Sequence, residues 1–173
     1  MRIVSLSTPF STDVIKTLSA GDRVKLSGTI YTGRDAAHKR MTGLLGDNMP
    51  LPFDVAGQAI YYAGPCPAPP GKAIGSAGPT TSARMDAYAP RLIKEGLRVM
   101  IGKGARTEAV VDAICRYSGL YLAAVGGAGA LISKCVGRAE LVAFEDLGPE
   151  AIYRLTVYDM PLIVAIDSVG GKI

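Results

Sequence analysis

The chain has 173 residues, enough for one domain with a complete apolar core. Hydrophobic residues make up 49% of it and charged residues 20%, a globular composition that excludes a disordered chain. The net charge of +4 is spread out, with no long Lys/Arg run and no basic surface interleaved with aromatic residues, so the composition favours a small anionic ligand over nucleic acid.

Cysteine and histidine usage gives no sign of a metal site or of disulfide bonds. The three cysteines are odd in number, far apart and without a CxxC pair: Cys66, Cys115 and Cys135. They and the single histidine form no recognisable ligand set, so we expect no metal bound by this chain. The sequence shows no signal peptide and no apolar run of the roughly 18 residues that span a bilayer, so we expect a reducing, cytoplasmic location and no membrane partner.

The first part of the chain predicts alternating strands and helices. Apolar and polar residues alternate as in half-buried strands, or apolar residues recur at helical spacing. The expected elements are strands at 2–6, 23–31 and 58–63, with helices at 13–18 and 34–45.

The second part opens with a Pro- and Gly-rich segment, residues 64–78, which we expect to be an ordered loop over the site. The elements expected after it are helices at 85–95, 106–117 and 129–135 and strands at 97–101, 120–125, 139–144, 152–158 and 162–167. The last strands favour antiparallel pairing. The whole pattern predicts a single mixed α/β domain over residues 1–173.

Residues 78–86 combine a turn, three hydroxyls and an arginine. Gly78-Pro79 signals a turn, and the next three residues are all capable helix caps. A helix beginning here would direct free backbone N–H groups and its positive dipole end at a ligand, with Arg84 about one turn in, on the side of Thr80. Backbone, hydroxyl and guanidinium together predict an anion site.

Two further junctions before helices each offer a cation. Arg34 begins a helix four residues before His38, where a positive charge opposes the helix dipole unless a ligand anion lies against it. Lys103 lies between two glycines directly after a strand, where α/β folds bind ligands. Taken singly, a solvated helix start and an ordinary turn lysine explain these residues at least as well. Arg34, Arg84 and Lys103 together suit a small dicarboxylate, which needs a cation for each carboxylate.

Nucleotide binding and triad chemistry are disfavoured. Gly126–Gly129 lies between a strand and a helix, but the GxGxxG spacing is absent, so we expect either tight packing of strand against helix or backbone amides that line a site. The sequence contains neither a GxxxxGK[ST] phosphate loop nor a nucleophile elbow.

Several stretches carry a more specific signal: Gly21-Asp22-Arg23-Val24 with residues 26–40, residues 78–86, Met100-Ile101-Gly102-Lys103-Gly104, residues 125–131, Glu150-Ala151-Ile152 and Asp159-Met160-Pro161. In this order they resemble the β-subunit type of iron–sulfur hydro-lyases, the family of class I fumarases and L-tartrate dehydratases. The resemblance covers nearly the whole chain.

The resemblance implies a swivelling β/β/α domain and a site shared with a partner. An α subunit would hold a four-iron, four-sulfur cluster by three cysteines, with an open iron position acting as a Lewis acid on the substrate. Arg34, Arg84 and Lys103 would bind substrate carboxylates, and Thr80 would be the candidate base. Asp35 and His38 lie within the matching motif and would orient Arg34.

The resemblance therefore predicts the β subunit of a fumarate hydratase that forms (S)-malate and is active only with its α subunit. An alcohol such as that of Thr80 is a weak base and would need nearby cations or a water relay. The β subunit of an L-tartrate dehydratase shares the same motifs and stays an alternative, as does a non-catalytic anion-binding or assembly module. The sequence leaves a higher oligomer open.

Overall fold

The computed structural model describes residues 2–124 and 129–173. Its strands are β1 (Ile3–Ser7), β2 (Arg23–Thr32), β3 (Ala59–Tyr61), β4 (Val99–Gly102), β5 (Leu120–Ala123), β6 (Val136–Ala143) and β7 (Ile152–Ile166). Its α-helices are α1 (Thr12–Lys16), α2 (Asp35–Gly46), α3 (Ala89–Lys94), α4 (Glu108–Tyr117) and α5 (Gly129–Ser133), and its 3₁₀ helices are η1 (Ser82–Met85) and η2 (Glu145–Glu150).

The seven strands form one mixed sheet that closes on itself. Strands β1 to β5 lie side by side in chain order and are parallel to one another. The long strand β7 runs antiparallel to them and pairs with both β5 and β2, while β6 pairs with the first half of β7. Because β7 connects β2 with β5, the carboxyl ends of β2, β3 and β4 are gathered at one edge.

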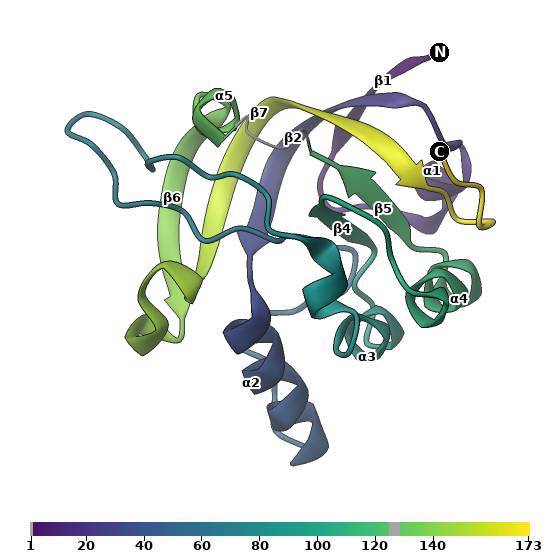
Figure 1. The fold of residues 1–173 in the computed structure, drawn as a ribbon, viewed down its shortest axis with the longest axis horizontal. Helices are drawn as coiled ribbons and strands as arrows, with labels where there is room; N and C mark the ends of the chain where they lie inside the picture. The colour runs from purple at the N-terminus through teal and green to yellow at the C-terminus, as the bar shows by residue number, and fades with distance from the viewer. Residues whose placement is uncertain (1, 125–128) are drawn as a thin grey trace.

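Two apolar clusters pack on the two faces of this sheet. Successive residues of β3 and β4 alternate between them, as side chains of a strand must: Tyr61 and Ile101 face one cluster, Ile60 and Met100 the other. The second cluster is covered by α2, α3 and α4, which Figure 1 shows together on one side of the sheet, with α5 on the opposite side. Both faces of β3 and β4 are therefore buried.

The predicted mixed α/β fold with a mixed sheet in a single domain is confirmed. Two element predictions were wrong. The helix expected at 85–95 is divided into the short η1 and α3, with a turn between them. The strands expected at 152–158 and 162–167 are one continuous strand, because β7 carries its irregularity at Asp159 (φ 49°) without leaving the sheet.

The Pro-rich segment 64–78 is a hairpin-like loop that packs on the protein. Its two arms are joined by the hydrogen bonds from Cys66 N to Ser76 O (2.9 Å) and from Gly75 N to Cys66 O (3.0 Å). Ile74 is buried in the first apolar cluster, and loop residues share a hollow of about 380 Å³ with Ala139 of β6 and Tyr153 of β7. The loop runs across β7 and β6 in Figure 1, so its tip lies away from the gathered strand ends.

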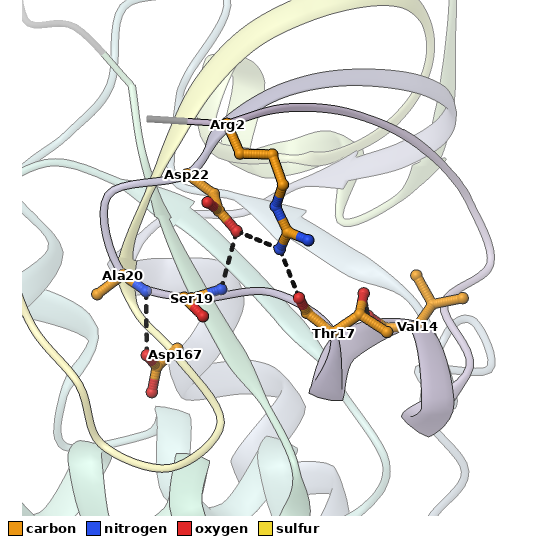
Figure 2. A network of polar contacts seen from close by, with 7 residues as sticks. All are labelled: Arg2, Val14, Thr17, Ser19, Ala20, Asp22 and Asp167. Atoms are coloured by element: carbon orange, nitrogen blue, oxygen red, sulfur yellow. Dashed lines mark hydrogen bonds and ion pairs between the residues drawn. The ribbon is translucent and has the colours of Figure 1, made fainter.

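A polar network fastens the turn between α1 and β2 (Figure 2). The Asp22 carboxylate accepts hydrogen bonds from Arg2 Nη2 (2.6 Å) and from Ser19 N (3.0 Å), and the same arginine nitrogen donates to Thr17 O. The hydrogen bond from Arg2 is the main cause that lowers the pKa of Asp22.

Asp167 joins this turn to the end of the chain. Its Oδ2 accepts from Ala20 N at 3.0 Å (Figure 2), and its Oδ1 accepts from Val169 N (3.1 Å) and Gly171 N (2.8 Å). Asp167 itself is buried, so one carboxylate in the interior serves as the acceptor for three backbone N–H groups. No helix in residues 2–124 or 129–173 is both long and apolar enough to cross a bilayer.

We predict that Asp167→Ala lowers the free energy of unfolding by about 1–3 kcal/mol, because backbone donors lose their buried acceptor. Urea denaturation measures this change. Asp47→Ala is the matched control: Asp47 is exposed after α2, and its removal should change stability by less than about 0.5 kcal/mol. Equal losses in the two variants would contradict the role assigned to Asp167.

Candidate active site

The carboxyl ends of β2, β3 and β4 carry the residues that the sequence singled out. Arg34 lies two residues beyond β2 at the cap position of α2, and Lys103 directly follows β4. This is the edge where parallel α/β sheets bind ligands, because the connections that leave the strands there converge.

The segment 80–82 is added to this edge as a short extended stretch. Thr80 N donates to Tyr62 O just beyond β3 (2.6 Å), and Ser82 N donates to Lys103 O (2.9 Å). Thr81 and Lys103 pair as an isolated parallel bridge. The backbones that carry Thr80 and Lys103 are therefore neighbours, and both residues are half-buried.

This pairing corrects the predicted helix start. The N–H groups of Thr80 and Ser82 are used by the carbonyls of Tyr62 and Lys103, so they are not available as a free helix N-terminus. Only the four-residue η1 follows, and its cap residue Thr81 makes no side-chain capping bond. At the segment 80–82, an anion would therefore be met by side chains and not by the start of a long helix.

A glycine makes the pairing possible. A Cβ added at Gly102 would lie 2.0 Å from Ser82 Oγ and 2.9 Å from Tyr62 Cδ2. Any side chain there would push the segment 80–82 off the end of β4. The glycine before Lys103 therefore brings the two segments together.

The Arg34 side chain lies across the end of β3. A Cβ at Gly64 would come within 3.2 Å of Arg34 Cδ, so the glycine leaves room for the arginine. Arg34 Nε is buried and finds no hydrogen-bond partner among the described residues, where Glu150 Oε1 lies 3.8 Å away. Arg34 thus keeps unused hydrogen-bonding capacity at this edge.

Asp35 contacts Arg84. Its Oδ2 accepts from Arg84 Nε at 2.9 Å and lies 2.9 Å from Arg84 Nη2. We expected Asp35 to orient Arg34, but its carboxylate binds Arg84. Since Asp35 engages Nε and Nη2, the Nη1 side of the half-exposed Arg84 guanidinium is the part free to meet a ligand.

The His38 ring contacts the backbone carbonyl of Arg34. The ring is fully buried, and its Nδ1 lies 2.8 Å from Arg34 O. A carbonyl can only accept, so Nδ1 carries the proton and Nε2 is left as an unpartnered acceptor in a pocket beside the Tyr62 ring. Burial lowers the pKa of His38 to about 4, and the positive charge of Arg106 adds to this, so the ring is neutral near pH 7.

Sequence reasoning missed two groups near this edge. Glu150 was part of a quoted motif but had no assigned role, and it faces Arg34. Arg106 and Asp86 form a buried ion pair, with 2.7 Å between Nε and Oδ1. Their separation by twenty residues follows no helical or strand period, so no local pattern could have paired them.

The glycine-rich stretch 126–129 lies outside the described residues except for Gly129. A Cβ at Gly129 would lie 2.8 Å from Gly78 N, so at this one position close backbone packing explains the glycine.

The three cysteines do not suit an iron–sulfur cluster. Cys66 and Cys115 are exposed, Cys135 is half-buried, and they lie on the Pro-rich loop, on α4 and after α5. Among the residues that the structure describes, no three His, Cys, Asp or Glu side chains gather as a metal site.

Fold and site together define a mixed α/β domain with three cations and a threonine carried to one sheet edge. The profile of the family named "Fumarase C-terminus" matches residues 1–173 of the sequence, and the chain belongs to this family.

Individual relatives agree with this assignment. The aerobic class I fumarate hydratase of Salmonella typhimurium is 38% identical over 173 residues, which cover 97% of this chain and 30% of that protein. The anaerobic class I enzyme of Escherichia coli is 39% identical over 86% of this chain and 28% of its own length. The chain thus spans about a third of the fumarate hydratases that it matches.

One relative has a similar length. A Methanocaldococcus jannaschii protein, provisionally named an L(+)-tartrate dehydratase subunit beta, is 41% identical over 92% of this chain and 85% of that protein. The relatives bear the names of hydro-lyases, so the family is one of lyases and their subunits.

We predict that the free energy of unfolding falls as the pH is lowered from about 6.5 to about 4, and that His38 accounts for roughly 3 kcal/mol of the fall. In this window His38 of the unfolded chain, with an ordinary pKa of 6.5, binds a proton, whereas His38 of the folded chain stays neutral. The contribution is complete above pH 6.5 and is lost toward pH 4.

Urea denaturation of the wild type and of His38→Gln across this range measures the effect. Glutamine keeps an amide N–H for Arg34 O but does not titrate, so the stability of the variant should depend less steeply on pH. Parallel pH curves for the two proteins would show that the buried imidazole is not the group responsible.

Proposed function

We propose that this chain is the β subunit of an iron–sulfur-dependent hydro-lyase that reversibly hydrates fumarate to (S)-malate. Its site would be shared with an α subunit that holds the four-iron, four-sulfur cluster. The observation that carries the proposal is the pairing of the segment 80–82 with Lys103 at the edge where Arg34 and Arg84 also emerge. The names of the fumarate hydratase relatives support the reaction type.

The three cations would bind the two carboxylates of the substrate. Arg34 offers an Nε without a partner, and Arg84 offers the side of its guanidinium that Asp35 leaves free. Lys103 adds a flexible ammonium group beside the hydroxyl-bearing segment. Charge-assisted hydrogen bonds to carboxylates are about twice as strong as neutral ones, so these contacts would fix the orientation of a small dicarboxylate.

Thr80 would hold the proton that is exchanged with the substrate carbon. Its backbone is held beside the backbone of Lys103 by the bond to Tyr62 O and the neighbouring bridge. The alcohol of Thr80 can lose its proton near neutral pH only if nearby positive charge stabilises the alkoxide, and the ammonium of Lys103 and the two guanidinium groups would supply that charge. The cluster on the α subunit would supply the Lewis acid for the substrate hydroxyl.

A tartrate dehydratase is the second candidate for the same site. It is favoured by the relative of similar length, which bears that name and is 41% identical. Tartrate carries one more hydroxyl than malate, and the described residues of this chain do not distinguish the two dicarboxylates. A non-catalytic anion-binding module stays a third possibility.

The test is co-expression with a cysteine-bearing α subunit and anaerobic purification of the complex. Loss of fumarate ultraviolet absorbance, with formation of malate, measures hydration, and a parallel assay follows oxaloacetate from L-tartrate. We expect fumarate hydration by the complex, and neither activity nor iron–sulfur absorbance in the β chain alone. Activity on tartrate only would favour the second candidate. A cluster-loaded complex inactive on both would favour a non-catalytic module.

In the complex, we predict that Arg84→Ala lowers kcat/KM for fumarate by about 100-fold, because a charge-assisted contact to a carboxylate is lost. Steady-state kinetics at equal cluster content measures this loss. Lys134→Ala is the matched control, since Lys134 is an exposed cation after α5, and it should stay within about twofold of the wild type. Equal losses would place Arg84 outside the site.

A further inference from the structure

Two segments of the candidate site are joined by a buried ion pair. Asp86 directly follows η1, which contains Arg84, and Arg106 lies three residues beyond Lys103. Arg106 Nε donates to Asp86 Oδ1 at 2.7 Å, and Asp86 Oδ2 accepts from Thr107 N at 2.6 Å. The side chains are 0% and 5% exposed. Asp86 is therefore close in sequence to Arg84, and Arg106 is close in sequence to Lys103, and these are two of the proposed carboxylate-binding cations.

Two tyrosine rings enclose the guanidinium of Arg106. Its central carbon lies 5.2 Å from the ring centroid of Tyr62 and 4.8 Å from that of Tyr121, within the range of cation–π attraction. Arg106 Nη2 also donates to the Tyr62 hydroxyl at 3.1 Å. The backbone carbonyl of Tyr62 accepts the hydrogen bond from Thr80 N, so the residues around Arg106 also contact the segment that carries Thr80.

Tyr121 adds a neutral link between the same two segments. Its hydroxyl lies 2.9 Å from Ser82 Oγ and 2.8 Å from Gly104 O. Since the carbonyl can only accept, the phenol proton goes to Gly104 and the Ser82 hydroxyl supplies the second bond. Both hydroxyl-bearing residues, Tyr121 and Ser82, are buried beneath the edge, whereas Gly104 is exposed.

Arg84 is thus bracketed by Ser82 and Asp86, and both are tied to the turn that carries Lys103. The ties are the backbone bond from Ser82 to Lys103, the Tyr121 hydroxyl, and the ion pair. Because these contacts lie on both sides of Arg84, the distance between Arg84 and Lys103 cannot increase to admit a longer ligand unless one contact breaks. If the turn that carries Lys103 were held only by β4, it could move and the distance could increase.

We propose that this buried clamp, Asp86–Arg106 with Tyr121, fixes the spacing between Arg84 and Lys103 and so selects four-carbon over longer dicarboxylates. The inference rests on the proposed function, in that these two cations bind the substrate carboxylates. The clamp residues touch no substrate; they are positioning residues. A fixed distance between two cations penalises a chain longer by one methylene group, which a movable pair would accommodate.

The test compares succinate with glutarate as inhibitors of the αβ complex. In the wild type we expect succinate to bind at least about tenfold more tightly than glutarate. In Tyr121→Phe, which removes the hydroxyl and keeps the ring over Arg106, we expect this ratio to fall to about threefold or less. Tyr31→Phe is the matched control: it removes a buried hydroxyl on β2 that contacts Arg154, and the ratio should stay at the wild-type value.

Ser82→Ala provides a second variant, since it removes the other hydroxyl of the link, and it should lower the ratio in the same direction. A ratio that stays at the wild-type value in both variants, with or without loss of thermal stability, would overturn the proposal. Binding of both acids is also measured by calorimetry, which needs no turnover. A complex inactive on fumarate and tartrate would then refute the proposed function, while the binding ratios would still decide on the clamp.

Discussion

The pairing of β7 with both β2 and β5 is the constraint on which the rest of the structure depends. A set of parallel strands alone would leave two open sheet edges and a fanned arrangement of connections. By joining β2 to β5, β7 brings the carboxyl ends of β2, β3 and β4 around one edge. Three cations and a threonine separated by up to 69 positions in sequence, from Arg34 to Lys103, thereby come from one part of the molecule.

Local patterns in the sequence were sufficient for elements whose burial follows a simple period. Strand β2 alternates and α2 repeats at helical spacing, and both appear within one or two residues of the expected positions. The helix expected at 85–95 begins only at Ala89, with Pro90 in its first turn, the position where a residue without an N–H is tolerated. The helix start expected within 78–86 is absent because carbonyls of Tyr62 and Lys103 take the N–H groups of Thr80 and Ser82, and no local pattern predicts these acceptors, which are distant in sequence. Similarly, Asp159 and Pro161 resemble a break between strands, yet pairing on β2 carries β7 through both.

The candidate site was predictable as a set of residue types and not as a set of contacts. Residue chemistry and family motifs pointed to Thr80, Arg34, Arg84 and Lys103, and their roles toward a substrate stay predictions. The sequence did not predict which charged side chains pair: Asp35 is adjacent to Arg34 in sequence but binds Arg84. Contacts beneath the edge, such as Asp86 with Arg106, depend on how β4 and its following turn lie against η1.

The position of the two chain ends has a consequence for how such a domain is combined with others. Ile3 and Ile163 both pair with Arg23 at the beginning of β2, so the termini lie at the end of the sheet opposite the site, on one side in Figure 1. Strand β2 is ten residues long, a distance of about 30 Å. In the fumarate hydratases that it matches, the similar region is only about a third of a single chain, so a domain joined at residue 1 would be attached at the end of the sheet opposite Thr80. Under the proposed function, a link from there would have to cover this length, whereas a separate subunit would need no such link.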